Sequence, residues 1–172
     1  MKTAMLALCG AIALGVCAPA QAHITLEQQQ AAVGAFYKAV MRVGHGCKGS
    51  PTVAIRVRIP DGVIGVKPMP KPGWTLTTRI EPYAQPAKLF EHTLTEGVRE
   101  IAWTGGNLPD DWYEEFVFRG KLPDGPAGTT VWFPVVQECA QGVHRWIEIP
   151  AAGKSPGDYP EPAPGVTLTP RN

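Results

Sequence analysis

The sequence predicts an all-β fold, specifically an antiparallel β-sandwich, and three observations lead to that prediction. Seven short segments have the apolar pattern of strands, and turn-forming residues separate them, with 19 glycines and 18 prolines in 172 residues. No segment has the strong apolar periodicity of an amphipathic helix. Five tryptophans supply bulky groups for packing between two sheets.

Residues 52–60 give the clearest strand pattern. Val53, Ile55 and Val57 lie on one face of this segment and Arg56 lies on the other, which is typical of a strand with one buried face. The other predicted strands are residues 35–43, 74–80, 98–103, 114–119, 130–136 and 144–149.

Residues 151–172 follow the last predicted strand and differ from it in composition. They are rich in Pro, Gly and Ala and have no periodicity, which is typical of an extended, poorly ordered segment. We therefore predict one sandwich domain over residues 23–150, long enough to bury a sizeable core, followed by a tail over residues 151–172.

Residues 1–22 have the parts of a secretory signal peptide. Lys2 provides a basic start, and the apolar run over residues 3–16 is too short for a stable membrane span. Ala20-Gln21-Ala22 then gives the small-x-small pattern that signal peptidase requires. We predict cleavage after Ala22, a periplasmic or secreted protein, and His23 as its new N-terminus.

The charge balance argues against several classes of partner. Lys2 is the only charged residue of the predicted signal peptide, so its removal reduces the 16 Lys and Arg to 15, equal to the 15 Asp and Glu. A balanced chain has no general attraction to nucleic acid, and we expect no such partner. The sequence also lacks a phosphate-binding glycine loop and a nucleophile elbow, so we expect no enzyme.

Two cysteines, Cys47 and Cys139, remain after cleavage. In an oxidising compartment a pair of this kind is most simply a disulfide. Closing a loop of about 90 residues stabilises a fold by roughly 4–5 kcal/mol. The alternative is a thiolate pair that binds metal, which oxidation of exported thiols disfavours.

An N-terminal histidine has a chemistry that internal histidines lack. Its α-amine and its imidazole Nδ1 can bind one metal ion together and close a six-membered ring. The amine must be neutral to bind, and its reference pKa of about 7.7–8.0 makes this easy near neutral pH. Two nitrogens in a tetragonal arrangement favour Cu(II). The alternative is that cleavage falls before a histidine by chance.

The other histidines are weaker candidates. His45 lies in a Gly-flanked turn beside Cys47 and could reach the mouth of a sandwich, or it could be a turn residue without a role. His144 is two residues before Trp146, so on a strand both side chains would share a face. His92 lies among charged residues, where we expect a solvated side chain.

The order of several short segments resembles the YcnI-like family of exported copper-binding domains. The resemblance covers nearly all of the mature chain, from His23 to about Pro164. The segments that carry it are residues 23–26, 59–63, 68–74, 101–106, 115–123 and 144–150.

This resemblance implies a cupredoxin-like or immunoglobulin-like sandwich and a Cu(II) brace with one histidine, which is His23 here. In the family a glutamate completes the site and a tryptophan lies close to the metal; Trp146 matches the tryptophan. The glutamate does not match, because the family's Val-Pro-x-Glu stretch corresponds to residues 43–46, where Gly46 stands at the glutamate position. His45 is the candidate substitute, which requires a turn or bulge to bring it to the site.

We therefore expect a metallochaperone-like protein of copper homeostasis that exchanges copper with a donor or acceptor protein in the cell envelope. A Cys47–Cys139 disulfide would hold the His45 turn near the strand that carries Trp146. The alternatives are a copper oxidase or monooxygenase that uses His45 or His144 as a second histidine, and a metal-free structural sandwich.

Overall fold

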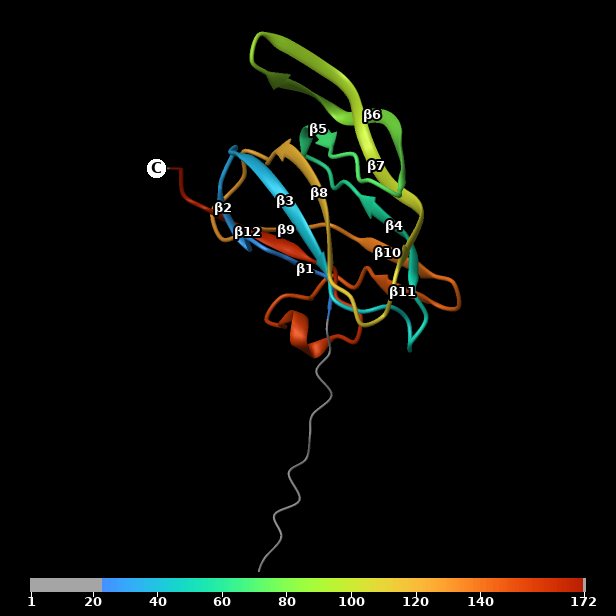
Figure 1. Cartoon of the computed structure of the whole chain (residues 1–172). Helices are drawn as coiled ribbons and strands as arrows, with labels where there is room; N and C mark the ends of the chain where they lie inside the picture. Colours follow the sequence, from blue (N-terminus) through green and yellow to red (C-terminus); the bar gives the residue numbers. More distant parts are fainter. Residues whose placement is uncertain (1–22, 172) are drawn as a thin grey trace, which may run out of the picture.

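The computed structural model describes residues 23–171, so the predicted signal peptide lies outside the described residues. The described part contains twelve strands and a single turn of 3-10 helix (Figure 1). These elements are β1 (Thr25–Leu26), β2 (Gln30–Ala32), β3 (Phe36–Val43), β4 (Thr52–Arg58), β5 (Ile64–Pro68), β6 (Thr75–Leu89), β7 (His92–Leu108), β8 (Glu114–Lys121), β9 (Thr130–Trp132), β10 (Val135–Cys139), β11 (Val143–Trp146), η1 (Pro156–Asp158) and β12 (Gly165–Thr169).

The strands form three sheets, which confirms the predicted antiparallel β-sandwich. One sheet has the order β1-β3-β8-β5, a second has the order β11-β10-β4-β7-β6, and a small third sheet has the order β2-β12-β9. All pairs are antiparallel except β2 with β12. Within residues 23–171, no helix is long and apolar enough to cross a bilayer.

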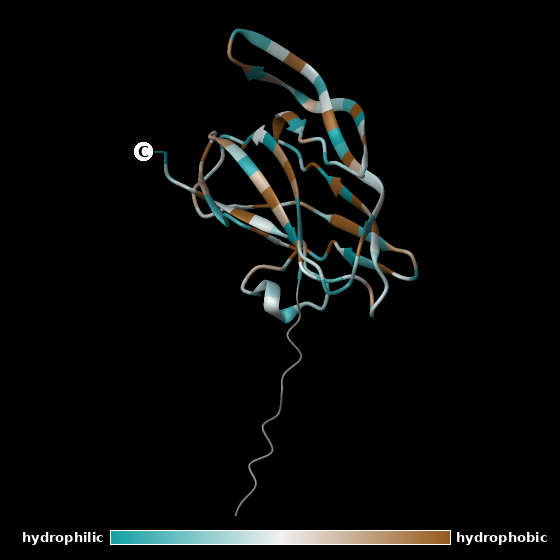
Figure 2. Ribbon diagram, viewed as in Figure 1, coloured by the Kyte–Doolittle hydropathy of each residue, from teal (hydrophilic) through white to brown (hydrophobic). Residues whose placement is uncertain are grey.

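Aromatic side chains fill the space between the two larger sheets. Trp103 of β7 and Phe116 of β8 are fully buried, and their ring centroids lie 5.5 Å apart. Trp74 packs against Phe116 as well, with ring centroids 4.9 Å apart. The buried indole N–H of Trp103 donates to the carbonyl of Met69 at 3.0 Å, so its polar atom is satisfied. Figure 2 shows the banding of apolar and polar positions along β3, whose Tyr37, Ala39, Met41 and Val43 belong to this core.

The strand prediction is correct for β3, β4 and β8 and differs elsewhere in ways that have physical causes. Residues 130–136, predicted as one strand, form β9 and β10 in two different sheets, because Pro134 has no N–H to continue the first ladder. Strands β6 and β7 run well beyond the predicted segments and form a long hairpin that projects from the sandwich (Figure 1). His92 lies exposed at the start of β7 in this hairpin.

The prediction of a poorly ordered tail is wrong for residues 165–169. These residues form β12, which pairs in parallel with β2 and antiparallel with β9. Val166 and Leu168 alternate with half-buried positions and are 0 % and 1 % exposed. The alternation covers only five residues between two prolines, and it is too short to stand out in a segment rich in Pro, Gly and Ala. The sandwich therefore extends past residue 150 and includes β12.

We predict that Leu168→Ala lowers the free energy of unfolding by about 2–5 kcal/mol, because it opens a cavity in the core. Thr169→Ala on the same strand is the matched control and should change it by less than about 1 kcal/mol, since Thr169 is only half-buried. Urea unfolding followed by tryptophan fluorescence measures both. Equal changes in the free energy of unfolding for the two variants would mean that residues 165–169 are poorly ordered after all.

Candidate metal centre

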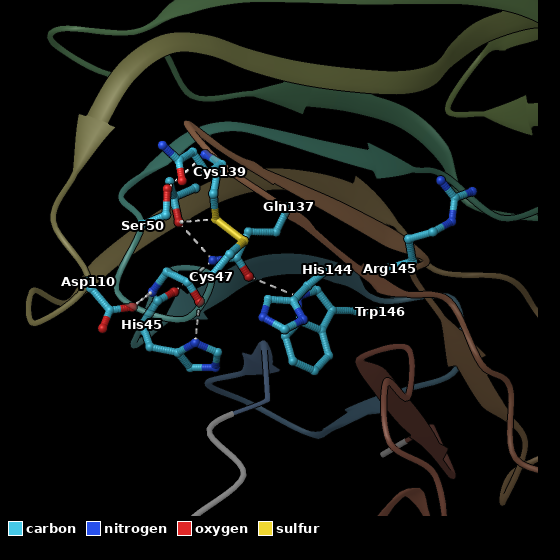
Figure 3. The surroundings of a disulfide bond; sticks show 12 residues. His45, Cys47, Ser50, Asp110, Gln137, Cys139, His144, Arg145 and Trp146 are labelled. Carbon is cyan, nitrogen blue, oxygen red and sulfur yellow. Dashed lines mark hydrogen bonds between the residues drawn. A yellow bond between two sulfur atoms is a disulfide. The ribbon is translucent and has the colours of Figure 1, made fainter.

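Three of the four histidines lie around the indole of Trp146. His23 lies two residues before the start of β1, His45 lies in the loop after β3, and His144 shares β11 with Trp146. The ring centroid of Trp146 is 5.6 Å from that of His23, 6.1 Å from that of His45 and 4.9 Å from that of His144. Figure 3 shows the His144 and Trp146 rings close together and His45 across from them. The fourth histidine, His92, is outside this cluster.

Gln137 of β10 fixes the position of Trp146. Trp146 is 3 % exposed, and its indole N–H donates to the amide oxygen of Gln137 at 2.9 Å. The amide nitrogen of Gln137 donates at 2.7 Å both to the carbonyl of His45 and to the hydroxyl of Thr52. Gln137 is fully buried and uses both of its N–H donors, so one side chain joins β11, β10, β4 and the His45 loop.

The loop after β3 brings His45 to the site by a tight turn. The N–H of Gly46 donates to Asp110 Oδ1 at 2.8 Å. A Cβ at position 46 would lie 2.0 Å from the carbonyl oxygen of Ser50, so this loop accepts no side chain there. A glutamate at position 46 would clash in this loop, and the predicted substitute, His45, lies in the cluster.

The tautomer of His45 follows from its neighbour. His45 Nδ1 lies 2.6 Å from the carbonyl oxygen of Gly46, which can only accept. Nδ1 therefore carries a hydrogen, and in the neutral ring the lone pair is on Nε2. Nε2 is the atom through which His45 can bind a metal.

A disulfide links the His45 loop to β10. Cys47 and Cys139 are bonded, with their Cα atoms 5.9 Å apart. The predicted disulfide is present, and the alternative of a thiolate metal pair is set aside. Since Cys139 and Gln137 both belong to β10, two separate links hold the His45 loop to one strand.

Glu161 supports His144 and was missed by sequence reasoning. His144 Nδ1 lies 2.6 Å from Glu161 Oε1, and the N–H of Arg145 donates to Glu161 Oε2 at 3.0 Å. Burial tends to raise the pKa of Glu161, but the hydrogen bonds from His144 and Arg145 prevail and lower it below its ordinary value. Because a carboxylate accepts, His144 also holds its hydrogen on Nδ1.

The donor chemistry of this cluster fits copper. Imidazole nitrogens suit Cu, and removal of the residues before His23 would turn its α-nitrogen into an amine that can bind metal. Among residues 23–171, no three His, Cys, Asp or Glu side chains are arranged in advance to hold a metal ion. Side-chain rotation would thus have to accompany binding. The roles of His23 and His45 as ligands and of Trp146 as their neighbour at the metal stay predictions.

His23 also lines an open depression on the surface. A cavity of about 420 Å³ lies beside it, and its wall includes Thr25, Gln29, Trp132 and Lys154. His23 is therefore accessible from solvent on this side.

The fold and the cluster define an all-β sandwich domain with histidines gathered around a buried tryptophan. The chain belongs to the family described as "Domain of unknown function (DUF1775)", whose profile matches residues 23–168. The match bears out the YcnI-like resemblance, and its range includes β12.

Two relatives extend this assignment. The chain is 27 % identical over 129 residues to the copper-binding protein CutI of Bacillus subtilis (strain 168). That alignment covers 72 % of this chain and 56 % of CutI, so the chain spans little more than half of its relative. A crystal structure of an uncharacterized protein from Nocardia farcinica, described as having an immunoglobulin-like fold, matches with a TM-score of 0.61 and 27 % identity over 86 % of this chain and 98 % of that one. Of the two sandwich types expected, the immunoglobulin-like one is supported.

We predict that Gln137→Leu lowers the free energy of unfolding by about 2–5 kcal/mol, because it leaves buried partners of Gln137 without a hydrogen bond. Gln141→Leu is the control; residue 141 is exposed, so its substitution should cost less than about 0.5 kcal/mol. Chemical unfolding provides the measurement. If the two substitutions cost the same, Gln137 does not organise the site.

Proposed function

We propose that the protein binds Cu(II) through the α-amine and Nδ1 of His23 and through Nε2 of His45. The observation that carries the proposal is the approach of both rings to the buried indole of Trp146, at 5.6 and 6.1 Å. The name of the relative CutI supports copper as the metal. Bound there, copper is a Lewis-acidic and redox-active ion, and the residues of this chain determine how it is held.

The proposed role is copper handling or delivery outside the cytoplasm, with a copper donor or acceptor protein as partner. The Cys47–Cys139 disulfide supports an oxidising compartment, where such bonds persist. A signal peptide over residues 1–22 would deliver the chain there and leave His23 at the N-terminus.

We favour a carrier over a copper oxidase or monooxygenase. Trp146 is buried beneath the histidines and so limits the approach of oxidants to a metal bound beside it. The depression beside His23 is open, which supports exchange of the ion with a partner protein.

The decisive comparison is between protein that begins at His23 and protein with one alanine before it. The added residue turns the α-amine into an amide and removes one of the two chelating nitrogens. We expect the Cu(II) affinity to fall on the order of 100-fold, or about 2.8 kcal/mol. Competition with a chromophoric chelator measures it, and His92→Ala serves as the control that should leave affinity unchanged. Equal affinities with and without the alanine would refute the brace.

A second prediction concerns the disulfide. Cys47→Ser combined with Cys139→Ser should weaken Cu(II) binding even at temperatures where circular dichroism still reports the native fold, because the His45 loop loses one of its links to β10. The loss of stability should reach roughly 4–5 kcal/mol, the value for closing so long a loop. If the folded double variant binds Cu(II) as tightly as the native protein, the disulfide only stabilises the sandwich and His45 is not a ligand.

A further inference from the structure

We propose that His144 is a further ligand of the same metal ion and that Glu161 is the residue that positions it. This inference rests on the proposed copper function and extends the ligand set from two imidazoles to three. The segment that supplies Glu161 lies beyond residue 150, so the C-terminal region is part of the site.

The positions of the rings support a shared ion. The ring centroids of His45 and His144 lie 5.6 Å apart. Imidazoles that bind one metal ion have centroids roughly 4.5–6.5 Å apart, because each metal–nitrogen bond is about 2.0 Å. The two rings are nearly perpendicular, at 84°, and both are only half-buried. The separation of the rings is thus within the range for a shared ion, and their partial exposure leaves room for small side-chain adjustments when it binds.

The tautomers of the two rings also agree. His45 holds its Nδ1 hydrogen against the Gly46 carbonyl, and His144 holds its own against the Glu161 carboxylate. In both neutral rings the lone pair is thus on Nε2. A carboxylate on Nδ1 of a metal-binding histidine fixes the ring orientation and increases the basicity of the other nitrogen.

Glu161 is itself anchored on more than one side. Its carboxylate accepts from the backbone N–H of Arg145, and its own N–H donates to Glu148 Oε2 at 2.7 Å. The N–H of Glu148 in turn donates to the carbonyl of Glu161 at 3.2 Å. A partly exposed ion pair contributes little to stability, so this anchoring is better explained as orientation of His144.

The test combines Cu(II) affinity, measured by chelator competition, with the number of coordinated imidazoles, measured by pulsed electron paramagnetic resonance of their remote nitrogens. All variants begin at His23. The native protein should show three imidazoles. His144→Ala should show two and bind Cu(II) about 10–100-fold more weakly, whereas His92→Ala should match the native protein in both measurements.

Glu161 is tested as a positioning residue. Glu161→Ala should retain three imidazoles but lower affinity about 10-fold, and Glu161→Gln, which keeps an acceptor oxygen for His144, should restore most of the loss. If His144→Ala does not fold, His144→Gln replaces it, because its amide can still donate to Glu161; one imidazole should again be lost.

Two imidazoles in both the native protein and His144→Ala, together with equal affinity, would overturn the inference and leave His144 as a ring packed on Trp146. Failure of the proposed function is distinguishable from this result. If an alanine placed before His23 leaves the Cu(II) affinity unchanged, the His23 brace is refuted. If substitution of His144 removes one coordinated imidazole, His144 is a ligand, whatever the result of the alanine extension.

Discussion

One buried amide determines how the parts of the site are arranged. Gln137 accepts from the indole of Trp146 and donates to the His45 carbonyl and to Thr52, and Gln137, Trp146 and Thr52 are all buried. An unpaired buried polar group costs about 1–3 kcal/mol, so these groups cannot separate without a penalty. Cys139, two residues further along the inward face of β10, ties the same loop covalently. Residues of β10 therefore determine where His45 lies relative to Trp146.

Much of this arrangement can be predicted from local sequence. Alternation identifies β3, β4 and β8, because a strand with one buried face repeats every two residues. An even number of cysteines in an exported chain indicates the Cys47–Cys139 bond. The spacing of His144 and Trp146 indicates a shared face. These features succeed because each depends on neighbours along the chain or on a simple count.

What the sequence did not reveal depends on contacts between distant residues. Glu161 has no local signal, since its role is defined by His144 on another strand. Gln137, in contrast, does have a local signal. It alternates with Val135 and Cys139 on the buried face of β10, and a buried amide in such a position requires hydrogen-bond partners. The long β6–β7 hairpin lies largely exposed outside the core, so alternate burial does not mark its full length.

The parallel pairing of β2 with β12 determines when, relative to synthesis, the amino-terminal strands can complete their pairing. Thr167 is paired with Gln30, 137 positions earlier, and β12 also contacts β1, which begins two residues after His23. Synthesis proceeds from the amino end, and contacts so distant in sequence form slowly. β1 can pair with β3 early, whereas β2 finds its strand partner only once β12 has been made. The surroundings of His23 are accordingly completed only after β12 has been synthesised.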